Sequence, residues 1–172
     1  MRASAGPNQP TTAGRLKKGK QSDPRSQVKS YASAFDAKGI RVRTDFHSSR
    51  ASLMADRKKL MRVMDNLLGN ALKFTPAKGE VKVAVKRSDD QLEVTVADSG
   101  IGLAPEHLEK VFERFFQVDT SYTRASGGIG MGLTIAAEIV EAHGGRMRAE
   151  SKGPGKGTRI IFSLPFEIQN SA

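Results

Sequence analysis

Residues that could do chemistry occur first at Asn66, Asn70 and Lys73. In a helix, side chains spaced four and three residues apart fall on one strip, and Phe74 lies at the edge of this one. Asparagine is a mediocre helix former, so two of them one turn apart do nothing for the helix itself. An amide oxygen is a hard ligand suited to magnesium, which binds phosphates. The strip is therefore a candidate metal and phosphate site, and the alternative is an ordinary solvated helix face.

A carboxylate ends the apolar alternation of LEVTVADSGIG. Asp98 has the same parity as Leu92, Val94 and Val96, so its side chain should point with theirs into the interior. A buried carboxylate is costly unless it meets hydrogen-bond donors. Glycines follow at positions 100 and 102, which leaves room for a flat ligand, and a purine amino group is a suitable donor. The alternative is an ordinary Asp-Ser-Gly turn at the end of a strand.

Glycines also precede a helical pattern in SGGIGMGLTIAAEIVEAHGG, which covers residues 126–145. The apolar face of this predicted helix comprises Met131, Ile135, Ala136, Ile139 and Val140. We expect Thr134, Glu138 and Glu141 to point outward and Gly144 to cap the C-terminus. Free backbone N–H groups at a helix start bind anions, so the glycines indicate a phosphate site. The alternative is a flexible hinge.

Two better-known phosphate motifs do not fit these glycines. A Rossmann fingerprint would need a strand directly before them and a third glycine where the chain has Leu133. A P-loop would need Ser or Thr after its Gly-Lys pair, whereas Lys156 is followed by Gly157. Any phosphate site here must belong to another type.

The elements that must position these residues follow from apolar periodicity. We expect helices at 24–38, 56–74 and 131–143, and strands at 40–46, 80–86, 92–98, 146–151 and 158–166, with a polar region at 99–128. The second helix has the strongest amphipathic signal, and the strands around RSDDQ read as a hairpin with Val81, Val83 and Val85 on one face and the leucine and valines of the next strand on another. This order predicts an α+β fold, a two-layer α/β sandwich whose mixed, largely antiparallel sheet has about three helices on one face.

Composition and charge limit the classes of function. The net charge is +10, but residues 1–50 carry +8 of it and the remainder only +2, so strong nucleic-acid binding is not expected. The absence of cysteine excludes thiol catalysis and zinc-thiolate sites, and no apolar run approaches the ~20 residues of a membrane span. We expect a disordered basic linker or appended tail at 1–22, one folded domain at 23–167 and a tail at 168–172.

Five motifs together resemble a known family. NLLGNALKFTP, DSGIG, FERFF, GGIGMGL and GKGT have the order and spacing of the N, G1, F, G2 and G3 boxes of sensor histidine kinases. This Bergerat-type ATP-binding domain is shared with gyrase, the mismatch-repair MutL proteins and the heat-shock chaperone ATPases. The resemblance runs from about Val28 to Phe166 and implies binding of ATP with Mg²⁺.

The resemblance also implies roles for single residues. Asn70 resembles the magnesium-binding Asn, Lys73 the phosphate contact, and Phe74 the aromatic residue against adenine. Asp98 resembles the adenine-selecting carboxylate, with Thr158 nearby through water; Thr158 shares strand parity with Ile160, so it too should face inward. Phe112, Phe115 and Phe116 resemble the anchors of the ATP lid, and ordinary core packing is their alternative. The other expected nucleotide-binding residues are Gly100, Gly102, Gly128, Gly130, Met131, Gly132 and Leu133.

Departures from the family pattern concern the phosphate end. Gln117 stands where many members have a phosphate-directed arginine, which leaves Arg114 and Arg124 as open candidates, and Ile129 replaces a frequent threonine. Asn66 occupies the position of the general-base glutamate of the family's ATP hydrolases, and we count it as a catalytic residue. None of the three histidines resembles the phosphoacceptor motif, so we expect two surface histidines, at 47 and 107, and a helix-end His143.

The sequence thus predicts a catalytic domain that transfers the γ-phosphoryl group of Mg-ATP to a histidine on a separate dimerisation domain. The expected partners are that domain, in the same dimeric full-length protein, and a response regulator downstream. We expect a cytoplasmic location, with membrane attachment only through upstream segments. The alternatives are an anti-sigma-type serine kinase, a gyrase-like ATPase and an inactive nucleotide-binding module.

Overall fold

The computed structural model describes residues 24–46, 55–88, 90–118 and 130–165, in the predicted order of elements. The α-helices are α1 (Pro24–Ala37), α2 (Arg57–Phe74) and α4 (Gly132–Ala142), and two short 3₁₀ turns are η1 (Pro105–His107) and η2 (Lys110–Phe112). The strands are β1 (Arg41–Phe46), β2 (Glu80–Arg87), β3 (Gln91–Asp98), β4 (Arg146–Glu150) and β5 (Thr158–Pro165). The predicted tails, 1–22 and 168–172, lie outside the described residues.

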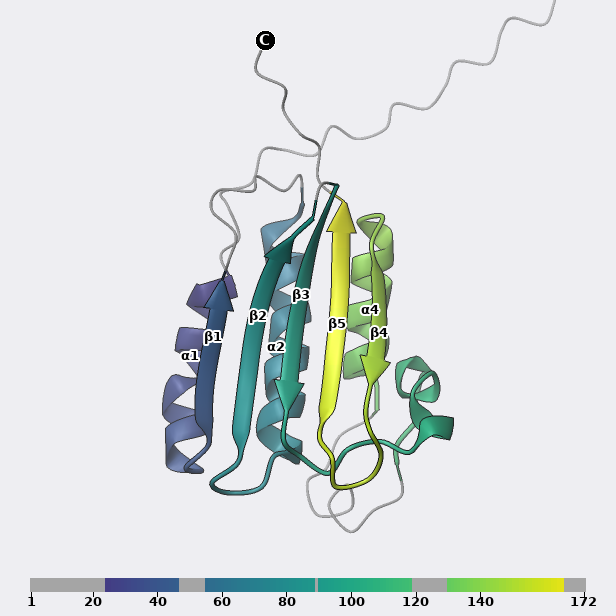
Figure 1. Cartoon of the computed structure of the whole chain (residues 1–172). Coiled ribbons are helices and arrows are strands. Elements are labelled where there is room, and N and C mark those ends of the chain that lie inside the picture. Colours follow the sequence, from purple (N-terminus) through teal and green to yellow (C-terminus); the bar gives the residue numbers. More distant parts are fainter. Residues whose placement is uncertain (1–23, 47–54, 89, 119–129, 166–172) are drawn as a thin grey trace, which may run out of the picture.

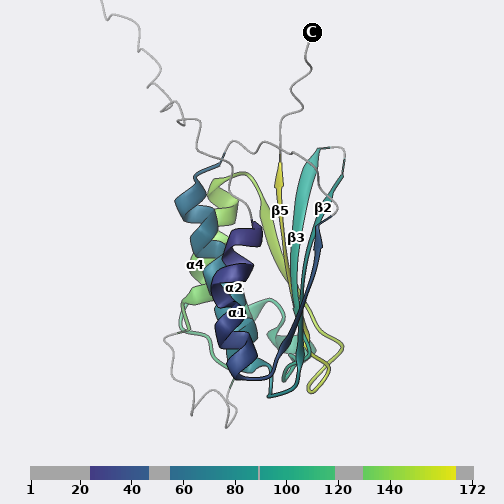
Figure 2. The same ribbon diagram turned by 90° about the vertical axis from the view of Figure 1, so that its left-hand side faces the viewer.

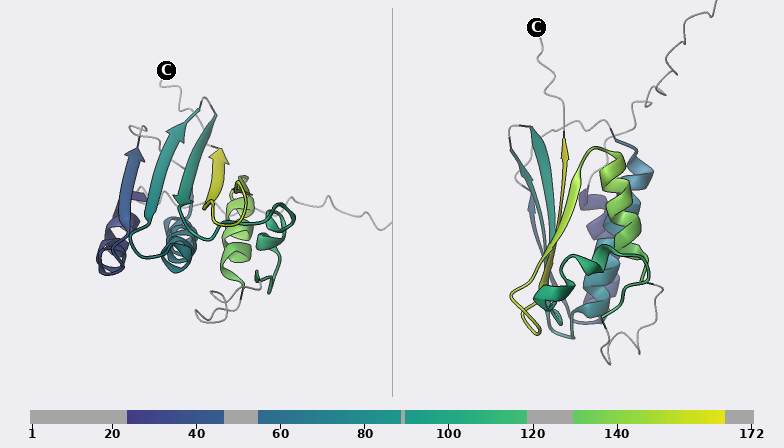
Figure 3. Two further views of the ribbon diagram at one scale, coloured as in Figure 1. Left: turned by 60° about the horizontal axis from the view of Figure 1, so that its bottom comes forward. Right: turned by 90° about the vertical axis from the view of Figure 1, so that its right-hand side faces the viewer.

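The five strands form one sheet in the order β1-β2-β3-β5-β4 (Figure 1). β1 pairs with β2 in parallel, and the other three pairs are antiparallel. The three α-helices cover one face of the sheet (Figures 2 and 3). The predicted two-layer sandwich with a mixed, largely antiparallel sheet is confirmed. No helix in the described ranges has the length and apolar character needed to cross a membrane.

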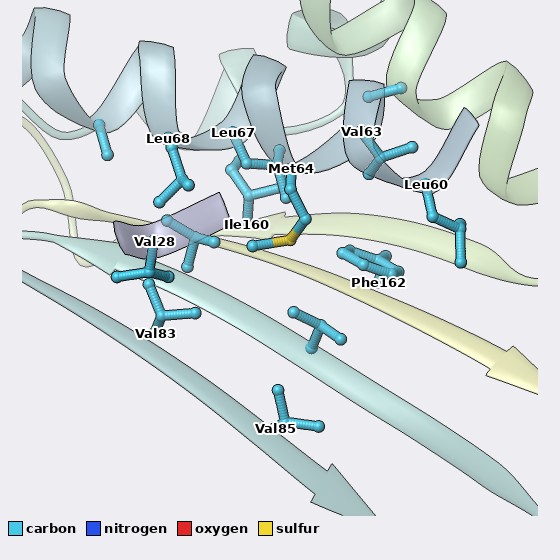
Figure 4. Close-up of a cluster of buried hydrophobic side chains, with 14 of the residues drawn as sticks. Val28, Leu60, Val63, Met64, Leu67, Leu68, Val83, Val85, Ile160 and Phe162 are labelled. Atoms are coloured by element: carbon cyan, nitrogen blue, oxygen red, sulfur yellow. The ribbon is translucent and has the colours of Figure 1, made fainter. Parts of the chain in front are cut away.

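Helix α2 lies in the middle of the helical layer and supplies much of the core. It begins after Asp56, whose carboxylate accepts the backbone N–H groups of Lys58 and Lys59 at 2.9 and 3.2 Å, so the first turn is capped. Its buried residues are Leu60, Val63, Met64, Leu67, Leu68 and Ala71, as the apolar spacing predicts. Figure 4 shows several of them against Val83, Ile160 and Phe162 of the sheet.

The register of the β2–β3 hairpin corrects one expectation. Val83 pairs with Val96, and Val85 with Val94. The apolar residues of both strands therefore share one face of the sheet, the face under the helices, instead of two faces. Side chains directly opposite each other in a ladder point to the same side of the sheet. One such pair is therefore enough to show that both strands have their apolar residues on the same face.

The predicted outward face of α4 is wrong at Thr134, which is only 7% exposed. Glu138 is exposed as expected, whereas Ile135 and Ile139 of the expected apolar face are only half-buried. Helix α4 packs against α2 as well as β4 and β5, so two of its sides are covered. At the other edge of the sandwich, Ala32 is exposed although its spacing places it on one helical face with Val28 and Phe35, and Thr44 is exposed although it alternates with Val42 and Phe46 in a strand-like pattern.

Side chains from other elements hold both ends of α2. At the C-terminus, Lys38 Nζ donates to the carbonyl oxygens of Leu72 and Lys73 at 2.7 and 3.2 Å. At the N-terminus, His143 Nε2 accepts the N–H of Asp56 at 3.1 Å, while its Nδ1 donates to Ile139 O at 2.7 Å. This pairing assigns His143 the neutral Nδ1–H tautomer and confirms it as a helix-end residue.

We expect Gly145→Ala to destabilise the domain by about 2 kcal/mol or more, in the range of overpacked cores. A Cβ at this position would overlap the carbonyl oxygen of Ser163 and would lie 2.9 Å from side-chain atoms of Leu164 and Val140. Gly69→Ala is the matched control: its Cβ would meet only Tyr31 Oη at 3.7 Å, and a helix gains roughly 0.5–1 kcal/mol from this exchange. Urea denaturation measures both, and equal effects would contradict the packing described here.

Candidate functional site

A pocket of about 490 Å³ opens where β3 ends and β5 begins, between α2, the start of α4 and the segment after β3. The predicted site residues that line it are Asn70, Lys73, Phe74, Asp98, Gly102, Phe116, Gly130, Met131, Gly132, Leu133 and Thr158. Its other lining residues are Gly69, Ile101, Leu103, Val111, Gln117, Val118 and Ile160. Of these seven, Ile160 could have been found from its inward strand parity. Gly128, Ile129 and Arg124 lie outside the described residues.

Asp98 is the last residue of β3 and faces inward as its parity predicts, directly opposite Thr158. Its Oδ1 accepts the backbone N–H groups of Gly100 and Thr158 at 2.8 and 3.3 Å. Burial raises the pKa of the Asp98 carboxyl, while these two hydrogen bonds act in the opposite direction. Both donors bond to one oxygen, so within the described part of the chain Oδ2 is left without a hydrogen bond and can accept one from a ligand.

The glycines after Asp98 are required by contacts between backbone segments. A Cβ at Gly100 would overlap the carbonyl oxygen of Phe74, and one at Gly102, where φ is +68°, would overlap that of Gly153. Gly100 itself does not line the pocket, so the room expected there for a flat ligand is taken by the chain. These residues bring the end of α2, the 99–103 segment and the β4–β5 loop into direct contact.

Helix α2 forms one wall of the pocket with Asn70, Lys73 and Phe74, all half-buried. Lys73 Nζ lies 4.9 Å from the centroid of the Phe74 ring, within the range of a cation–π contact. Asn66 lies one turn earlier, outside the lining, with Oδ1 3.2 Å from the place of a Cβ on Gly132. Its Nδ2 is buried and has no hydrogen-bond partner in the described ranges. The side chain of Asn66 thus projects from α2 toward the start of α4 and does not line the pocket.

The start of α4 forms the opposite wall. Met131 precedes the helix without a side-chain cap, and the first N–H groups of a helix have no partner within it. Together with the helix dipole, these donors favour an anion at Gly132 and Leu133, which both line the pocket. The electrostatics of this end therefore fit a phosphate.

The three phenylalanines of FERFF have different surroundings. Phe116 lines the pocket with its ring 5.4 Å from that of His107, and Phe112 is half-buried. Phe115 is 66% exposed, with φ at +65°, and its N–H donates to Gly130 O at 3.1 Å.

Two further residues near this turn differ in their surroundings. His107, expected at the surface, is half-buried because Phe116 packs against its ring; His47 lies outside the described residues. Arg114, one of the two arginines considered for the phosphate, forms an ion pair with Glu138 of α4 at 2.6 Å.

Comparison with known proteins gives consistent results. The family model described as histidine kinase-, DNA gyrase B-, and HSP90-like ATPase matches residues 55–168. The chain is 46% identical over 114 residues to the sensor histidine kinase WalK of Bacillus subtilis, covering 65% of this chain and 18% of WalK. It is 38% identical over 133 residues to the kinase BaeS of Escherichia coli, covering 77% of this chain and 28% of BaeS. It spans less than a third of either relative.

Solved structures agree in fold. The nucleotide-free catalytic domain of histidine kinase ThkA superposes with a TM-score of 0.73 at 26% identity, covering 83% of this chain and 91% of that domain. Full-length ShkA in complex with AMPPNP superposes with a TM-score of 0.73 at 30% identity, covering 83% of this chain and 29% of ShkA. ThkA in complex with the response regulator protein TrrA gives 0.70 at 25% identity, covering 83% of this chain and 39% of ThkA.

The family match covers more than half of the chain and contains all of the residues that line the pocket. The relatives are sensor kinases, and the structural neighbours include an isolated catalytic domain of the same type. The chain belongs to the histidine kinase-, DNA gyrase B- and HSP90-like ATPase family, and within it resembles the catalytic domains of sensor histidine kinases.

Proposed function

We propose that this domain binds Mg-ATP in the pocket and transfers the γ-phosphoryl group to a histidine on a separate dimerisation domain of the same full-length protein. One observation carries the proposal: a single pocket brings together the half-buried carboxylate of Asp98, the side chains of Asn70 and Lys73 on α2, and the N-terminus of α4. Each is suited to a different part of the nucleotide.

The adenine base belongs at the Asp98 end of the pocket. Oδ2 of Asp98 accepts a hydrogen bond from the 6-amino group, Phe74 and Ile160 contact the faces of the base, and Thr158 lies opposite Asp98. Oδ1 is already bonded to backbone, which fixes the carboxylate plane before the ligand arrives. Preorganised acceptors of this kind give specificity for the base.

The phosphates belong between Lys73 and the start of α4. Lys73 and the N–H groups of Gly132 and Leu133 supply positive charge. The amide oxygen of Asn70 is a hard donor that fits Mg²⁺, which when bound neutralises phosphate charge and keeps most of its water ligands. Phosphoryl transfer depends mainly on such positioning and charge stabilisation, so this set needs no covalent nucleophile of its own.

The recipient histidine must come from outside the described residues. His107 packs against Phe116, and both ring nitrogens of His143 are engaged in hydrogen bonds. A neutral imidazole nitrogen on the acceptor domain attacks the γ-phosphorus, the bond to the β-γ bridging oxygen breaks, and ADP leaves. The relatives are much longer sensor kinases, which supports an acceptor domain elsewhere in the same protein. ATP as the donor and a response regulator as the next recipient favour a cytoplasmic location.

Incubated with γ-labelled ATP and Mg²⁺, the chain alone should acquire almost no acid-labile phosphate, and a matching dimerisation domain added in trans should become labelled. We expect Asn70→Ala to lower the labelling rate at least tenfold, roughly the loss of one charge-assisted contact. Lys59→Ala, at an exposed position of the same helix, is the control and should leave it unchanged. Stoichiometric labelling of a histidine in the isolated chain would contradict the proposal.

Asp98→Asn should make the nucleotide-free domain more stable at neutral pH while it weakens ADP binding. Because burial raises the pKa of Asp98, its ionised carboxylate is less favourable in the folded chain than in the unfolded chain. This cost is fully present above the raised pKa and disappears as the pH falls through it toward the ordinary value of 3.8. The stability difference, measured by urea denaturation without nucleotide, should therefore shrink on acidification. A variant less stable than the parent at pH 7 would contradict this account.

Hydrolysis of bound ATP by the isolated domain should be slow, well below the ~1 s⁻¹ low end of ordinary enzymes. An amide cannot accept the proton of an attacking water at neutral pH. Asn66, at the position of the hydrolases' general base, therefore protects the nucleotide until an imidazole arrives. A steady-state phosphate-release assay checks the rate. Robust turnover would contradict this account, because it would show that bound ATP is not protected from hydrolysis.

A further inference from the structure

Two loops meet beneath the Asp98 end of the pocket: the segment after β3 and the loop that joins β4 to β5 (Figure 1). Their backbones are directly bonded, since Gly155 N–H donates to Ile101 O at 2.6 Å and Gly157 N–H donates to Gly100 O at 3.1 Å. Asp98 itself is held in the sheet, but the two N–H groups that bond to its Oδ1 come from Gly100 and from Thr158, which follows Gly157. The orientation of the carboxylate therefore depends on how these loops are held together.

One side chain, Ser151, bonds to both loops. Its Oγ accepts the N–H of Leu103 at 3.0 Å and that of Gly153 at 3.2 Å. The carbonyl oxygens of Gly157 and Gly153 lie 2.7 and 3.2 Å from the hydroxyl, and its one proton is donated to the nearer of them, Gly157 O. A hydroxyl has one proton to donate and two lone pairs, so these three bonds use its full capacity. Ser151 is half-buried and is not among the residues that line the pocket.

The bond to Gly157 continues to the carboxylate through a single peptide group. Ser151 donates to the carbonyl oxygen of the Gly157–Thr158 peptide, and the N–H of the same peptide donates to Asp98 Oδ1 at 3.3 Å. Hydrogen bonds in such a chain polarise one another, so the bond at the carbonyl strengthens the N–H as a donor. The second donor to Oδ1 comes from Gly100, in the loop that Ser151 holds through Leu103.

We propose that Ser151 is a positioning residue that orients the Asp98 carboxylate and so sets selectivity for a purine with a 6-amino group. The inference rests on the proposed function, because it takes Asp98 as the group that recognises adenine. Loss of the hydroxyl leaves the Gly157 carbonyl and the Leu103 N–H without this partner and frees the peptide that holds Oδ1. The carboxylate then loses its fixed orientation toward the amino group, while the walls formed by α2 and the start of α4, to which Ser151 does not bond, keep their shape.

The experiment measures dissociation constants of the full chain for ADP and for purine riboside 5′-diphosphate, which lacks the 6-amino group. Calorimetric titration gives the ratio of the two constants, which reports recognition of that group alone. We expect Ser151→Ala to lower the selectivity for ADP about threefold to tenfold, the range of one net hydrogen bond, and to leave affinity for the purine riboside compound unchanged. Ser151→Thr keeps the hydroxyl and should restore selectivity.

Matched variants separate positioning from a general structural effect. Ser88 also donates its hydroxyl to a loop carbonyl, Gln91 O at 3.2 Å, but at the opposite end of β2 and β3, so Ser88→Ala should leave the ratio unchanged. Ser151→Cys, a weak donor of similar size, should reproduce the loss and provides the comparison if the alanine variant does not fold. Equal weakening of both nucleotides in the Ser151 variants would overturn the inference.

Asp98→Asn distinguishes failure of this inference from failure of the proposed function. If Asp98→Asn lowers the selectivity and neither Ser151→Ala nor Ser151→Cys does, Asp98 recognises adenine without help from Ser151, and only the inference falls. If Asp98→Asn leaves the selectivity unchanged, the assignment of Asp98 to adenine is wrong and the inference falls with it.

Discussion

Burial of the apolar stripe of α2 is the interaction on which the rest of the structure depends. The helix packs against the sheet and against α4, and residues such as Leu67 and Leu68 are almost completely removed from water. Once one face of a helix is buried, the helix cannot rotate about its own axis, and the direction in which its other side chains point is fixed as well. Asn70 and Lys73 are therefore presented to the pocket by the same contacts that stabilise the core.

The pocket floor is built on a different principle, because it consists of loops. Gly100 and Gly102 permit close approach of backbone segments, and hydrogen bonds between the segments replace the regular ladder of a sheet. Strand β3 places Asp98, and a backbone N–H from the loop after it, that of Gly100, fixes one oxygen of the carboxylate. The raised pKa of Asp98 shows that the position is unfavourable for the charge itself. A carboxylate in such a position is understandable when a ligand supplies a further hydrogen-bond donor.

The phosphate end joins elements that are far apart in the sequence. Helix α2 supplies amide and ammonium groups, the start of α4 supplies backbone N–H groups, and the turn with Phe115 bonds to Gly130 just before α4. The side chain of Asn66 on α2 lies against Gly132 at the start of α4, so the two walls of the pocket are in contact there. A substitution that moves one wall should therefore also shift the position of the other.

The sequence by itself determined the elements, their order, the inward parity of Asp98 and Thr158, and the family, because these depend on local periodicity and on short motifs. It did not determine the shared face of the β2–β3 hairpin, the burial of Thr134 or the half-burial of His107. Those depend on which element packs against which, and a contact between neighbouring helices of one layer, such as α2 against α4, leaves no trace in the periodicity of one helix. The role of Ser151 was invisible for the same reason. A serine after a strand has no distinctive spacing, and only the tertiary structure brings its hydroxyl within hydrogen-bond distance of two loops that hold the carboxylate.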